Sequence, residues 1–327
     1  LAMGCQERGE IRFSELDPVQ LVDPFIGTGG HGHTFPGATV PFGMVQLSPD
    51  TRLEGWDGCS GFHASDSVLY GFSHTHLSGT GVSDYGDILL LPWVGETVMV
   101  NGADGASQGY GTGFDPQGQA AHPGYYQVCL DNGIEVELTA TARTGLHRYR
   151  YPAGASAKVI LDLEHRDQLL DHQFSVVNDR RFQGYRISKA WAEDQRIYYV
   201  IEFSAPFKEL TFNKELDNSS VIFFDFEQLK EPLEVRVGIS ATSTEAAAAN
   251  LDAEAPHFDF DEHRKAAEDQ WREFLGQFRI ASTDSSELTV FYTALYHTAI
   301  APNLFSDVTG TYRGTDGEIH QLQSEDK

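Results

Sequence analysis

The amino-acid sequence predicts a mainly β protein in which a large antiparallel β-sandwich is followed by α-helices. Between residues 124 and 241, stretches that alternate apolar and polar residues recur at intervals of roughly 8–15 residues, with turn residues between them. This spacing is typical of a large antiparallel sandwich. After residue 243 the composition becomes Ala-rich and acidic, and the apolar residues then follow the helical period.

The first part of the sandwich is predicted from residues 19–100, where short apolar runs alternate with Gly and Pro turns. The later strands are rich in Val, Ile, Tyr and Phe, which favour extended backbone. These predicted strands read YYQVCL, IEVELTATART, LHRYRYP, AKVILDL, FQGYRISKAW, RIYYVIEFSA, SVIFFDF and LEVRVGIS.

Residues 243–259 predict a linker or a short helix, because they are rich in alanine and end near a proline. Residues 261–278 predict an amphipathic helix, because apolar side chains recur at i, i+3, i+4 and i+7. The residues of this apolar face are Trp271, Phe274, Leu275 and Phe278.

A second helix is predicted to begin after Asp284, which with Glu287 is expected to form a capping box. Pro302 is expected to end it, and residues 303–327 predict a polar loop. Its apolar stripe consists of Leu288, Phe291, Leu295 and Ala299. Two helices alone cannot bury both apolar faces well, so they indicate the beginning of a helical domain.

Length and charge limit the classes of function. The chain has 327 residues, enough for about two domains, and a net charge of −25 with a pI near 4.7. Such a charge excludes nucleic acid as a partner and suits a neutral ligand such as a sugar, or a cation. No run of 18 apolar residues is present, so no membrane span is predicted.

The cysteines do not form a disulfide or zinc pattern, because there are three of them at wide spacing. Cys5 is a separate case, since LAMGC is a partial match to a bacterial lipoprotein cleavage site. Cys5 is therefore a candidate lipid anchor, although the same residues also fit a cloning remnant.

Histidines are concentrated near the N-terminus, and two H-x-H pairs, His31 with His33 and His74 with His76, are the candidate ligand groups. On a strand, residues i and i+2 share a face, so each pair could converge on one site. One hypothesis is a zinc hydrolase; the other is a set of hydrogen-bonding groups in a tightly turned region. Further ligands for zinc would come from His63, Asp66, Asp84 and Asp87.

Other catalytic arrangements are weakly indicated. Ser78 lies near His76 and Asp84, but no G-x-S-x-G elbow is present. Cys59 lies near His63, but a small buried cysteine is the better interpretation. The segment GTGGHGH lacks the GK[ST] ending of a phosphate-binding loop.

A carbohydrate site fits the mixture of residues in GWDGCSGFHASD. Sugars need aromatic faces for their C–H surfaces and fixed polar groups for their hydroxyls. Trp56 stands between glycines in a polar segment, with Asp57 beside it, so we expect it to be exposed to a ligand.

Three long segments resemble glycoside hydrolase family 92, a family of α-mannosidases. They are VDPFIGTGGHGHTFPGATVPFGMVQLSPDT, GWDGCSGFHASDSVLYGFSHTHLSGTGVSDYGDILLLP and FYTALYHTAIAPNLFSDVTGTYRG. The resemblance implies an N-terminal β-sandwich, a helical linker and a C-terminal (α/α)6 barrel. The expected parts are a tail over 1–20, the sandwich over 21–242, the linker over 243–280 and the start of a truncated barrel over 281–327.

The resemblance also implies a function. Family members are exo-acting, calcium-dependent, inverting α-mannosidases that act on N-glycans or yeast mannan. Many are periplasmic or cell-surface proteins of Gram-negative Bacteroidetes. Members continue well beyond the position that matches Lys327, and the acid, the base and most calcium ligands are expected there. The catalytic residues therefore stay unassigned, no metal ligand is expected here, and this fragment alone is expected to be inactive.

The resemblance assigns the loops over 27–37, 52–66 and 71–87 to the sandwich edge of the active-site cleft. Trp56 is the first candidate for a sugar contact and indicates α-1,2 specificity. The other candidate substrate-binding residues are Arg52, Asp57, His74, His76, Asp84, Arg313 and Asp316. The alternative function is a non-catalytic carbohydrate-binding domain.

Overall fold

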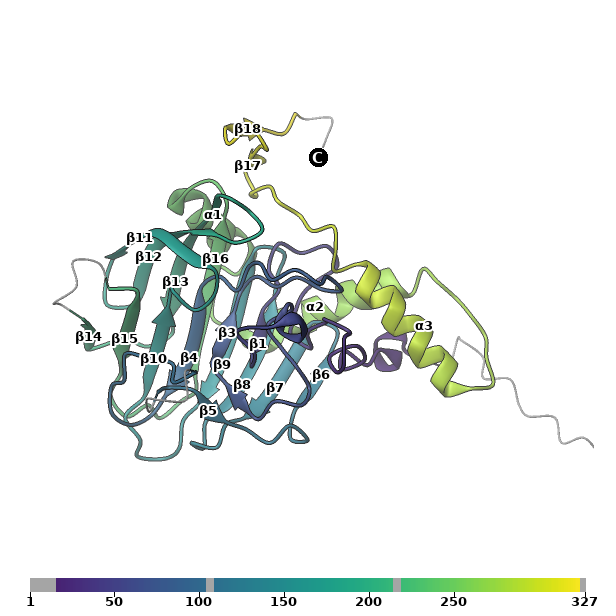
Figure 1. The fold of residues 1–327 in the computed structure, drawn as a ribbon, viewed down its shortest axis with the longest axis horizontal. Helices are drawn as coiled ribbons and strands as arrows, with labels where there is room; N and C mark the ends of the chain where they lie inside the picture. The colour runs from purple at the N-terminus through teal and green to yellow at the C-terminus, as the bar shows by residue number, and fades with distance from the viewer. Residues whose placement is uncertain (1–15, 104–108, 214–218, 324–327) are drawn as a thin grey trace, which may run out of the picture.

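The computed structural model describes residues 16–103, 109–213 and 219–323, and its main body is two antiparallel sheets stacked face to face (Figure 1). The prediction of a mainly β sandwich followed by helices is confirmed. Cys5 lies outside the described residues, so the candidate lipid anchor stays a prediction.

The larger sheet has eight strands in the order β11-β12-β13-β16-β9-β8-β7-β6. Neighbouring strands are antiparallel throughout. The strands are β6 (Ala120–His122), β7 (Tyr125–Cys129), β8 (Glu135–Ala140), β9 (Thr144–Arg150), β11 (Gln168–Val176), β12 (Arg181–Lys189), β13 (Gln195–Phe203) and β16 (Leu233–Ser240).

The smaller sheet has six strands in the order β1-β3-β4-β10-β15-β14. These are β1 (Ser48–Asp50), β3 (Gly71–Ser73), β4 (Leu89–Trp93), β10 (Lys158–Asp162), β14 (Glu209–Phe212) and β15 (Val221–Asp225). Two short ladders pair β2 (Val68–Leu69) with β5 (Thr112–Gly113), and β17 (Thr311–Arg313) with β18 (Ile319–Gln321).

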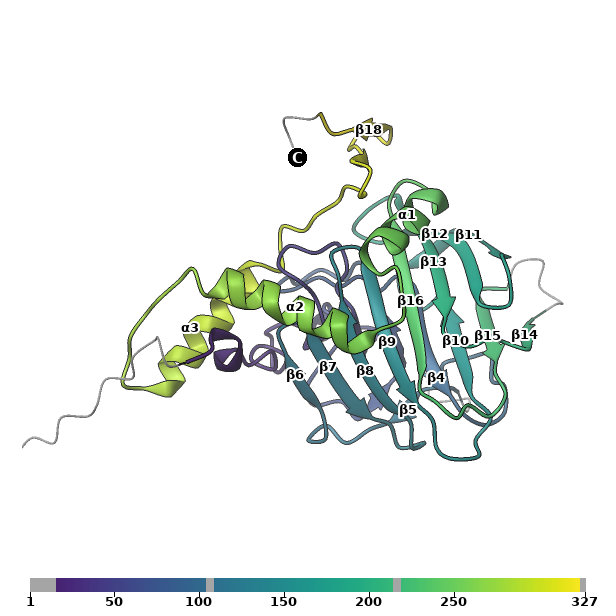
Figure 2. The same ribbon diagram turned by 180° about the vertical axis from the view of Figure 1, so that it is seen from behind.

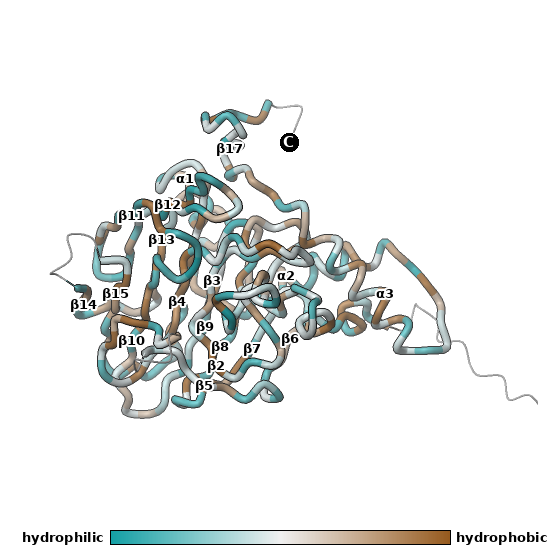
Figure 3. The backbone as a smooth tube through the Cα atoms, in the orientation of Figure 1, coloured by the Kyte–Doolittle hydropathy of each residue, from teal (hydrophilic) through white to brown (hydrophobic). Residues whose placement is uncertain are grey.

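The main core lies between the two sheets. Alternate residues of β12 are buried, as the period of two requires for a strand with one face on the core. Phe182 of β12 packs edge-on against Phe224 of β15, so aromatic side chains of the two sheets meet. Figure 3 shows hydrophobic residues along the central strands and mainly hydrophilic residues in the connecting loops.

Two helices lie on the outer face of the larger sheet (Figure 2). Helix α1 (Thr244–Glu254) packs on β13 and β16, and α2 (Phe260–Leu275) crosses β7, β8 and β9. Each begins at a capping side chain, because Ser243 accepts a hydrogen bond from the Ala246 amide and Asp259 accepts one from the Glu262 amide. None of the described helices combines the length and hydrophobicity that crossing a bilayer requires.

A second core joins α2 and α3 (Ser285–Thr298) to the start of the described chain. Trp271 is fully buried there, and its indole N–H donates to the Thr39 carbonyl at 2.6 Å. Val19, from the short 3₁₀ helix η2 (Pro18–Leu21), and Phe35 pack in the same cluster. The two helices therefore bury their apolar faces against N-terminal residues as well as against each other.

Several local predictions were incomplete. Strands β11 and β14 were not predicted, and residues 303–323 contain the β17–β18 hairpin where a polar loop was expected. The capping box at Asp284 is wrong in detail. Asp284 accepts from the Ser286 amide, while the Glu287 carboxylate accepts from the Ser282 hydroxyl.

Candidate functional site

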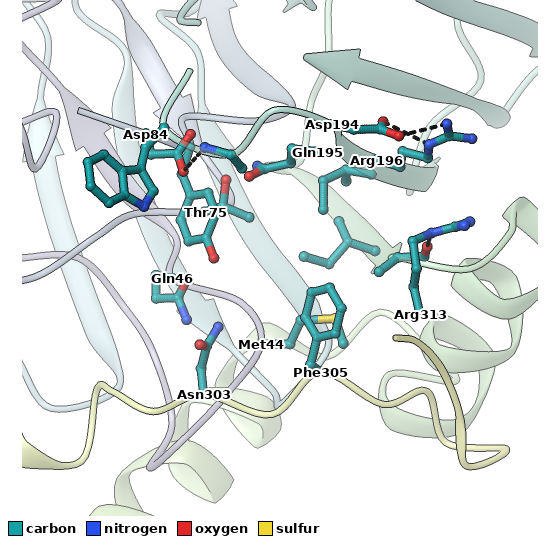
Figure 4. A pocket seen from close by; sticks show the side chains of 16 residues that line it. Met44, Gln46, Thr75, Asp84, Asp194, Gln195, Arg196, Asn303, Phe305 and Arg313 are labelled. Atoms are coloured by element: carbon teal, nitrogen blue, oxygen red, sulfur yellow. Dashed lines mark hydrogen bonds and ion pairs between the residues drawn. The ribbon is translucent and has the colours of Figure 1, made fainter. Parts of the chain in front are cut away.

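A cleft lies between the end of the sandwich and the chain segment that follows α3. It consists of two adjoining cavities of about 320 and 390 Å³. Five segments form its walls. They are residues 44–46, the loop 75–85, residues 191–197 at the β12–β13 connection and the start of β13, residues 239–241 at the end of β16, and residues 300–313. Figure 4 shows Asp84, Gln46 and Asn303 along one side of the first cavity.

Five residues line both cavities and therefore mark the centre of the cleft. They are Gln46, Asp84, Tyr85, Trp191 and Asn303. Trp191 is 75% exposed, so its indole presents an apolar surface at the cleft. Aromatic, amide and carboxyl groups are thus gathered around one concave space, which is the usual make-up of a site for a neutral polar ligand.

Asp84 is the carboxyl group at this centre. Its residue is 6% exposed, and its Oδ2 accepts a hydrogen bond from the Ala192 amide at 3.2 Å. Its Oδ1 is buried and has no hydrogen-bond partner among the described groups. Burial raises the pKa of Asp84 above its ordinary value. The cleft wall therefore contains a buried acceptor atom without a partner among the described groups, and a hydrogen bond from a ligand hydroxyl would offset the cost of leaving it unpaired.

The opposite side of the first cavity carries charges that are already paired. Arg196 donates two bonds of 2.8 Å to the Asp194 carboxylate. Arg313 lies at the same side of the cavity (Figure 4), and it donates to the Ala241 carbonyl at 2.9 Å and also to the Gly317 carbonyl. These contacts fix both guanidinium groups at the edge of the cleft.

The loop 71–87 is held by a buried polar network beneath its cleft-facing residues. The Thr75 hydroxyl donates to Asp87 Oδ2 at 2.7 Å, and Arg186 forms an ion pair with Asp87 Oδ1. Arg186 also donates to the Leu163 carbonyl at 2.7 Å and is 1% exposed. A buried guanidinium with several acceptors fixes the loop against the larger sheet.

His76 takes part in a second buried group. One ring nitrogen lies 2.8 Å from the Gln46 carbonyl, and the other lies 3.2 Å from Asp50 Oδ1. Burial favours the neutral form of Asp50, but the nearby His76 and His165 hold its pKa well below the ordinary value. His76 borders the second cavity, although its ring nitrogens are both occupied by protein groups.

His74 does not face the cleft. It is fully buried in the sandwich, where burial lowers its pKa to about 4. The distances fit a chain of neutral groups in which the Tyr149 hydroxyl donates to His147, His147 donates to His74, and His74 donates to the Ile88 carbonyl. The side chain predicted to bind sugar is therefore a support for the loop.

Trp56 lies on the outer side of the same loop. It is 61% exposed, in the short helix η3 (Trp56–Gly58), and a Cβ added at Gly81 would lie 2.3 Å from its ring. Only glycine at position 81 therefore allows the indole to lie on the loop here. Thr80 and Val82, on either side of Gly81, line the second cavity, so Trp56 stands next to the cleft.

The first histidine pair gathers around Trp56. His31 Nδ1 lies 2.6 Å from Asp57 Oδ1, and His33 Nε2 lies 3.6 Å from the same oxygen. The His33 ring meets the Trp56 ring edge-on at 4.9 Å. The His31 hydrogen bond lowers the pKa of Asp57, so the carboxylate is ionised.

Two other predicted residues do not line either cavity of the cleft. Arg52 is bound to Asp66 and Ser65 and borders a separate surface cavity. Asp316 lies in the β17–β18 turn, 3.0 Å from the His320 ring.

The residues of the cleft do not form a metal cage. Among residues 16–103, 109–213 and 219–323, no group of three or more His, Cys, Asp or Glu side chains is arranged to hold a metal ion. Calcium prefers six to eight oxygen ligands, and Asp84 is the one cleft carboxylate in this described part that is not paired with a cation. The described residues therefore do not fit a complete calcium site by themselves, and the two histidine pairs do not converge on a zinc site.

Comparison with known proteins decides the family. The family model for the glycosyl hydrolase family 92 N-terminal domain matches residues 21–240, and the model for the family 92 catalytic domain matches residues 246–326. The chain belongs to glycosyl hydrolase family 92. The resemblance identified from the sequence motifs is thereby confirmed.

Solved family 92 structures are similar along most of the chain. The α-mannosidase BT3965 from Bacteroides thetaiotaomicron is 32% identical, with a TM-score of 0.86 over 94% of this chain and 44% of that chain. A complex of the same protein with mannoimidazole gives the same agreement. The inverting mannosidase BT2199 from the same organism is 26% identical, with a TM-score of 0.82 over 94% of this chain and 43% of that one.

An uncharacterized secreted glycosidase from Arthroderma benhamiae is 26% identical over 90% of this chain and 43% of its own length. The family 92 chain described here therefore spans less than half the length of each of these relatives.

Sequence reasoning did not name four residues at the centre of the cleft, which are Gln46, Tyr85, Trp191 and Asn303, although Tyr85 lies in the predicted cleft loop 71–87. Trp191 is signalled less clearly than Trp56, because alanines rather than glycines flank it, although it follows a predicted strand and precedes the polar turn AED. The two amides carry no comparable local signal, since Gln and Asn are common surface residues.

Proposed function

We propose that this chain forms the sandwich wall of the substrate cleft in a calcium-dependent, exo-acting, inverting α-mannosidase that removes α-1,2-linked mannose from N-glycans or mannan. The observation that carries the proposal is Asp84, a buried carboxyl residue that lines both cavities and whose Oδ1 has no hydrogen-bond partner among the described groups. Membership of family 92 supports the reaction class.

The groups around Asp84 suit a sugar. Asn303 and Gln46 carry amides that can both donate and accept, as a hydroxyl-rich ligand requires. Trp191 and Trp56 offer exposed ring faces for the C–H surface of a pyranose. In this proposal Asp84 accepts from a mannose hydroxyl, and Trp56 contacts the sugar on the leaving-group side.

Inverting hydrolysis needs a carboxylic acid and a carboxylate base about 6.5–9.5 Å apart, with a water beside the base. No described residue is assigned either role, because Asp194 is bound by Arg196 and Asp84 is partly bound by Ala192. The described residues would bind and orient the substrate and exclude water. Calcium is proposed as the cofactor of the complete enzyme, with most of its ligands supplied by other residues.

Calorimetric titration with α-1,2-mannobiose tests the binding role. Asp84→Asn and Trp56→Ala should each raise the dissociation constant about tenfold, because each removes a direct contact worth about 1–1.5 kcal/mol. Asp269→Asn is the matched control, since Asp269 lies on α2 and pairs with Lys265. Unchanged affinity in both cleft variants would contradict the proposal.

Mannose release tests the reaction. The proposal expects release from α-1,2-mannobiose by the full-length enzyme, loss of release with EDTA, and β-mannose as the first product seen by NMR. Binding without release by the full-length protein would favour the alternative, a non-catalytic carbohydrate-binding protein. One observation favours that alternative. Inverting hydrolysis needs two carboxyl groups, whereas the described residues of the cleft supply one that is not paired with a cation.

The cellular location is part of the proposal. The name of the Arthroderma benhamiae relative describes a secreted protein, and the sequence around Cys5 suggests a lipoprotein in the periplasm or on the cell surface of a Gram-negative bacterium. Labelling of cells with a palmitate analogue should modify the wild-type protein and spare Cys5→Ser.

A further inference from the structure

A cavity outside the cleft lies on the outer face of the eight-stranded sheet. Its volume is about 290 Å³, and strands β11, β12 and β13 and the start of α1 line it. Figure 2 shows α1 beside this end of the sheet, at the ends of β12 and β13. The function proposed above makes no use of this cavity.

The packing of α1 explains why the cavity is there. Ala247 and Leu251 of α1 cover Val200 on β13, and a Cβ added at Gly238 of β16 would lie 2.5 Å from the Ala247 carbonyl oxygen. The helix thus lies directly on β13 and β16. It contacts β12 less extensively than β13 and β16, so the helix forms a wall beside a more open part of the sheet.

Two tyrosines supply outward-facing aromatic rings to this cavity. Tyr185 of β12 and Tyr198 of β13 are directly paired across the strands, with ring centroids 5.9 Å apart. They alternate with Phe182 and Tyr199, which belong to the core, so the tyrosine pair faces outward. Both are half-buried and present ring surface to the cavity.

Neutral polar groups surround the tyrosine pair. Gln173 stands opposite Tyr185 in the strand register, and Ser175 stands opposite Gln183. The Tyr185 hydroxyl donates to Asp171 Oδ2 at 3.0 Å, which fixes the ring and leaves the hydroxyl oxygen free to accept. No lysine or arginine lines this cavity in the described part of the chain, so its chemistry does not suit an anion.

We propose that this cavity is a second saccharide-binding site, which holds a part of an α-mannose glycan remote from the bond that is cleaved. The paired rings take the C–H face of a pyranose, and the amides of Gln173 and Gln183 bind its hydroxyls. The choice of mannose as the sugar rests on the function proposed above, while the site itself rests on the cavity and its residues.

The position of the site relative to the cleft supports this assignment. Arg196 precedes Tyr198 by two positions on the same face of β13 and lines the cleft. Two strand residues span about 7 Å, so the outer face of the β12–β13 hairpin connects the cleft edge to the tyrosine pair. A branched glycan with one end in the cleft could therefore reach the second site.

Affinity electrophoresis in gels containing yeast α-mannan tests the site, with dextran gels as the comparison. The double variant Tyr185→Ala/Tyr198→Ala should weaken retardation by mannan about five- to tenfold. Tyr185→Phe should keep most of it, because the ring remains. Leu170→Ala is the matched control, since this exposed apolar residue lies on β11 but does not line the cavity.

The binding of α-1,2-mannobiose by the same variants separates this proposal from the proposed function. Loss of mannan retardation with unchanged mannobiose affinity supports a second site. Unchanged retardation in a folded double variant would overturn it, whatever Trp56→Ala and Asp84→Asn do. Equal retardation of the wild type in dextran would also overturn it, because the site would then not select mannose.

Discussion

The two H-x-H pairs of this chain have the same spacing and different environments. His31 and His33 converge on Asp57 Oδ1, beside the exposed Trp56. His74 and His76 diverge, since one ring joins the core of the sandwich and the other binds Asp50. The first pair surrounds a surface group, whereas the second pair supports the cleft loop from beneath.

The difference shows that a short motif has no fixed role. His74 follows β3, and its backbone amide donates to the Asp87 carbonyl, which turns the ring into the sandwich. His31 lies in a glycine-rich turn and is exposed, whereas His33 of the same turn is buried. A histidine is therefore a ligand group or a support according to the backbone that carries it.

The largest effect is expected where the second pair meets a buried charge. His76→Ala should lower the free energy of unfolding by about 3–5 kcal/mol, because it removes one partner of the ionised, fully buried Asp50. Urea unfolding at pH 7 measures this loss. The Ser73 hydroxyl also donates to Asp50 Oδ2, and His165 lies 3.5 Å from Asp50 Oδ1. A loss under 1 kcal/mol would mean that these two residues satisfy Asp50 without His76.

Acid should also lower the stability of the fold through His74 of the second pair. Burial lowers the pKa of His74 to about 4, below its ordinary 6.5, so the unfolded chain binds a proton that the folded chain refuses. The stability due to neutral His74 is complete above pH 6.5 and falls, on the order of 3 kcal/mol, as the pH decreases to about 4.

The His74 contribution is measured as the difference in pH dependence between the wild type and His74→Gln. Burial raises the pKa of Asp167 to about 7, so protonation of Asp167 increases stability as the pH falls. This contribution is present in both proteins and cancels when their stabilities are subtracted. If the free energy of unfolding changed by the same amount in both proteins between pH 7 and pH 4.5, a neutral, buried His74 would be excluded.

A change beside Trp56, which the first histidine pair surrounds, should affect sugar affinity rather than the free energy of unfolding. Gly81→Ala places a methyl group against the Trp56 ring and should displace it. We expect about a fivefold loss of α-1,2-mannobiose affinity, with a change in unfolding free energy within about 0.5 kcal/mol. Wild-type affinity in this variant would remove Trp56 from the site.

The smallest effect is expected for His31→Ala. The His31 side chain is 78% exposed, so its removal should change the free energy of unfolding by no more than about 0.5 kcal/mol. The same unfolding experiment as for His76→Ala provides the comparison. A loss as large as that of His76→Ala would mean that both pairs are structural.

The sequence by itself determined the sandwich, the two amphipathic helices and the family, because alternation, helical period and long ordered motifs are local properties of the chain. The eight predicted strands all exist. Strand β11 escaped prediction because it is an edge strand with few buried side chains, and its sequence lacks the alternation that a covered face imposes.

Only the tertiary structure decided which side chains meet. Burial raises the pKa of Asp84, and its Oδ1 has no partner among the described groups. Its Oδ2 accepts from the Ala192 amide, which lies over a hundred residues further along the chain. Trp191 and Asn303 reach the same cleft from two other segments. Local patterns fix the direction of a side chain relative to its own strand or helix, whereas burial and pairing depend on distant segments that pack against it.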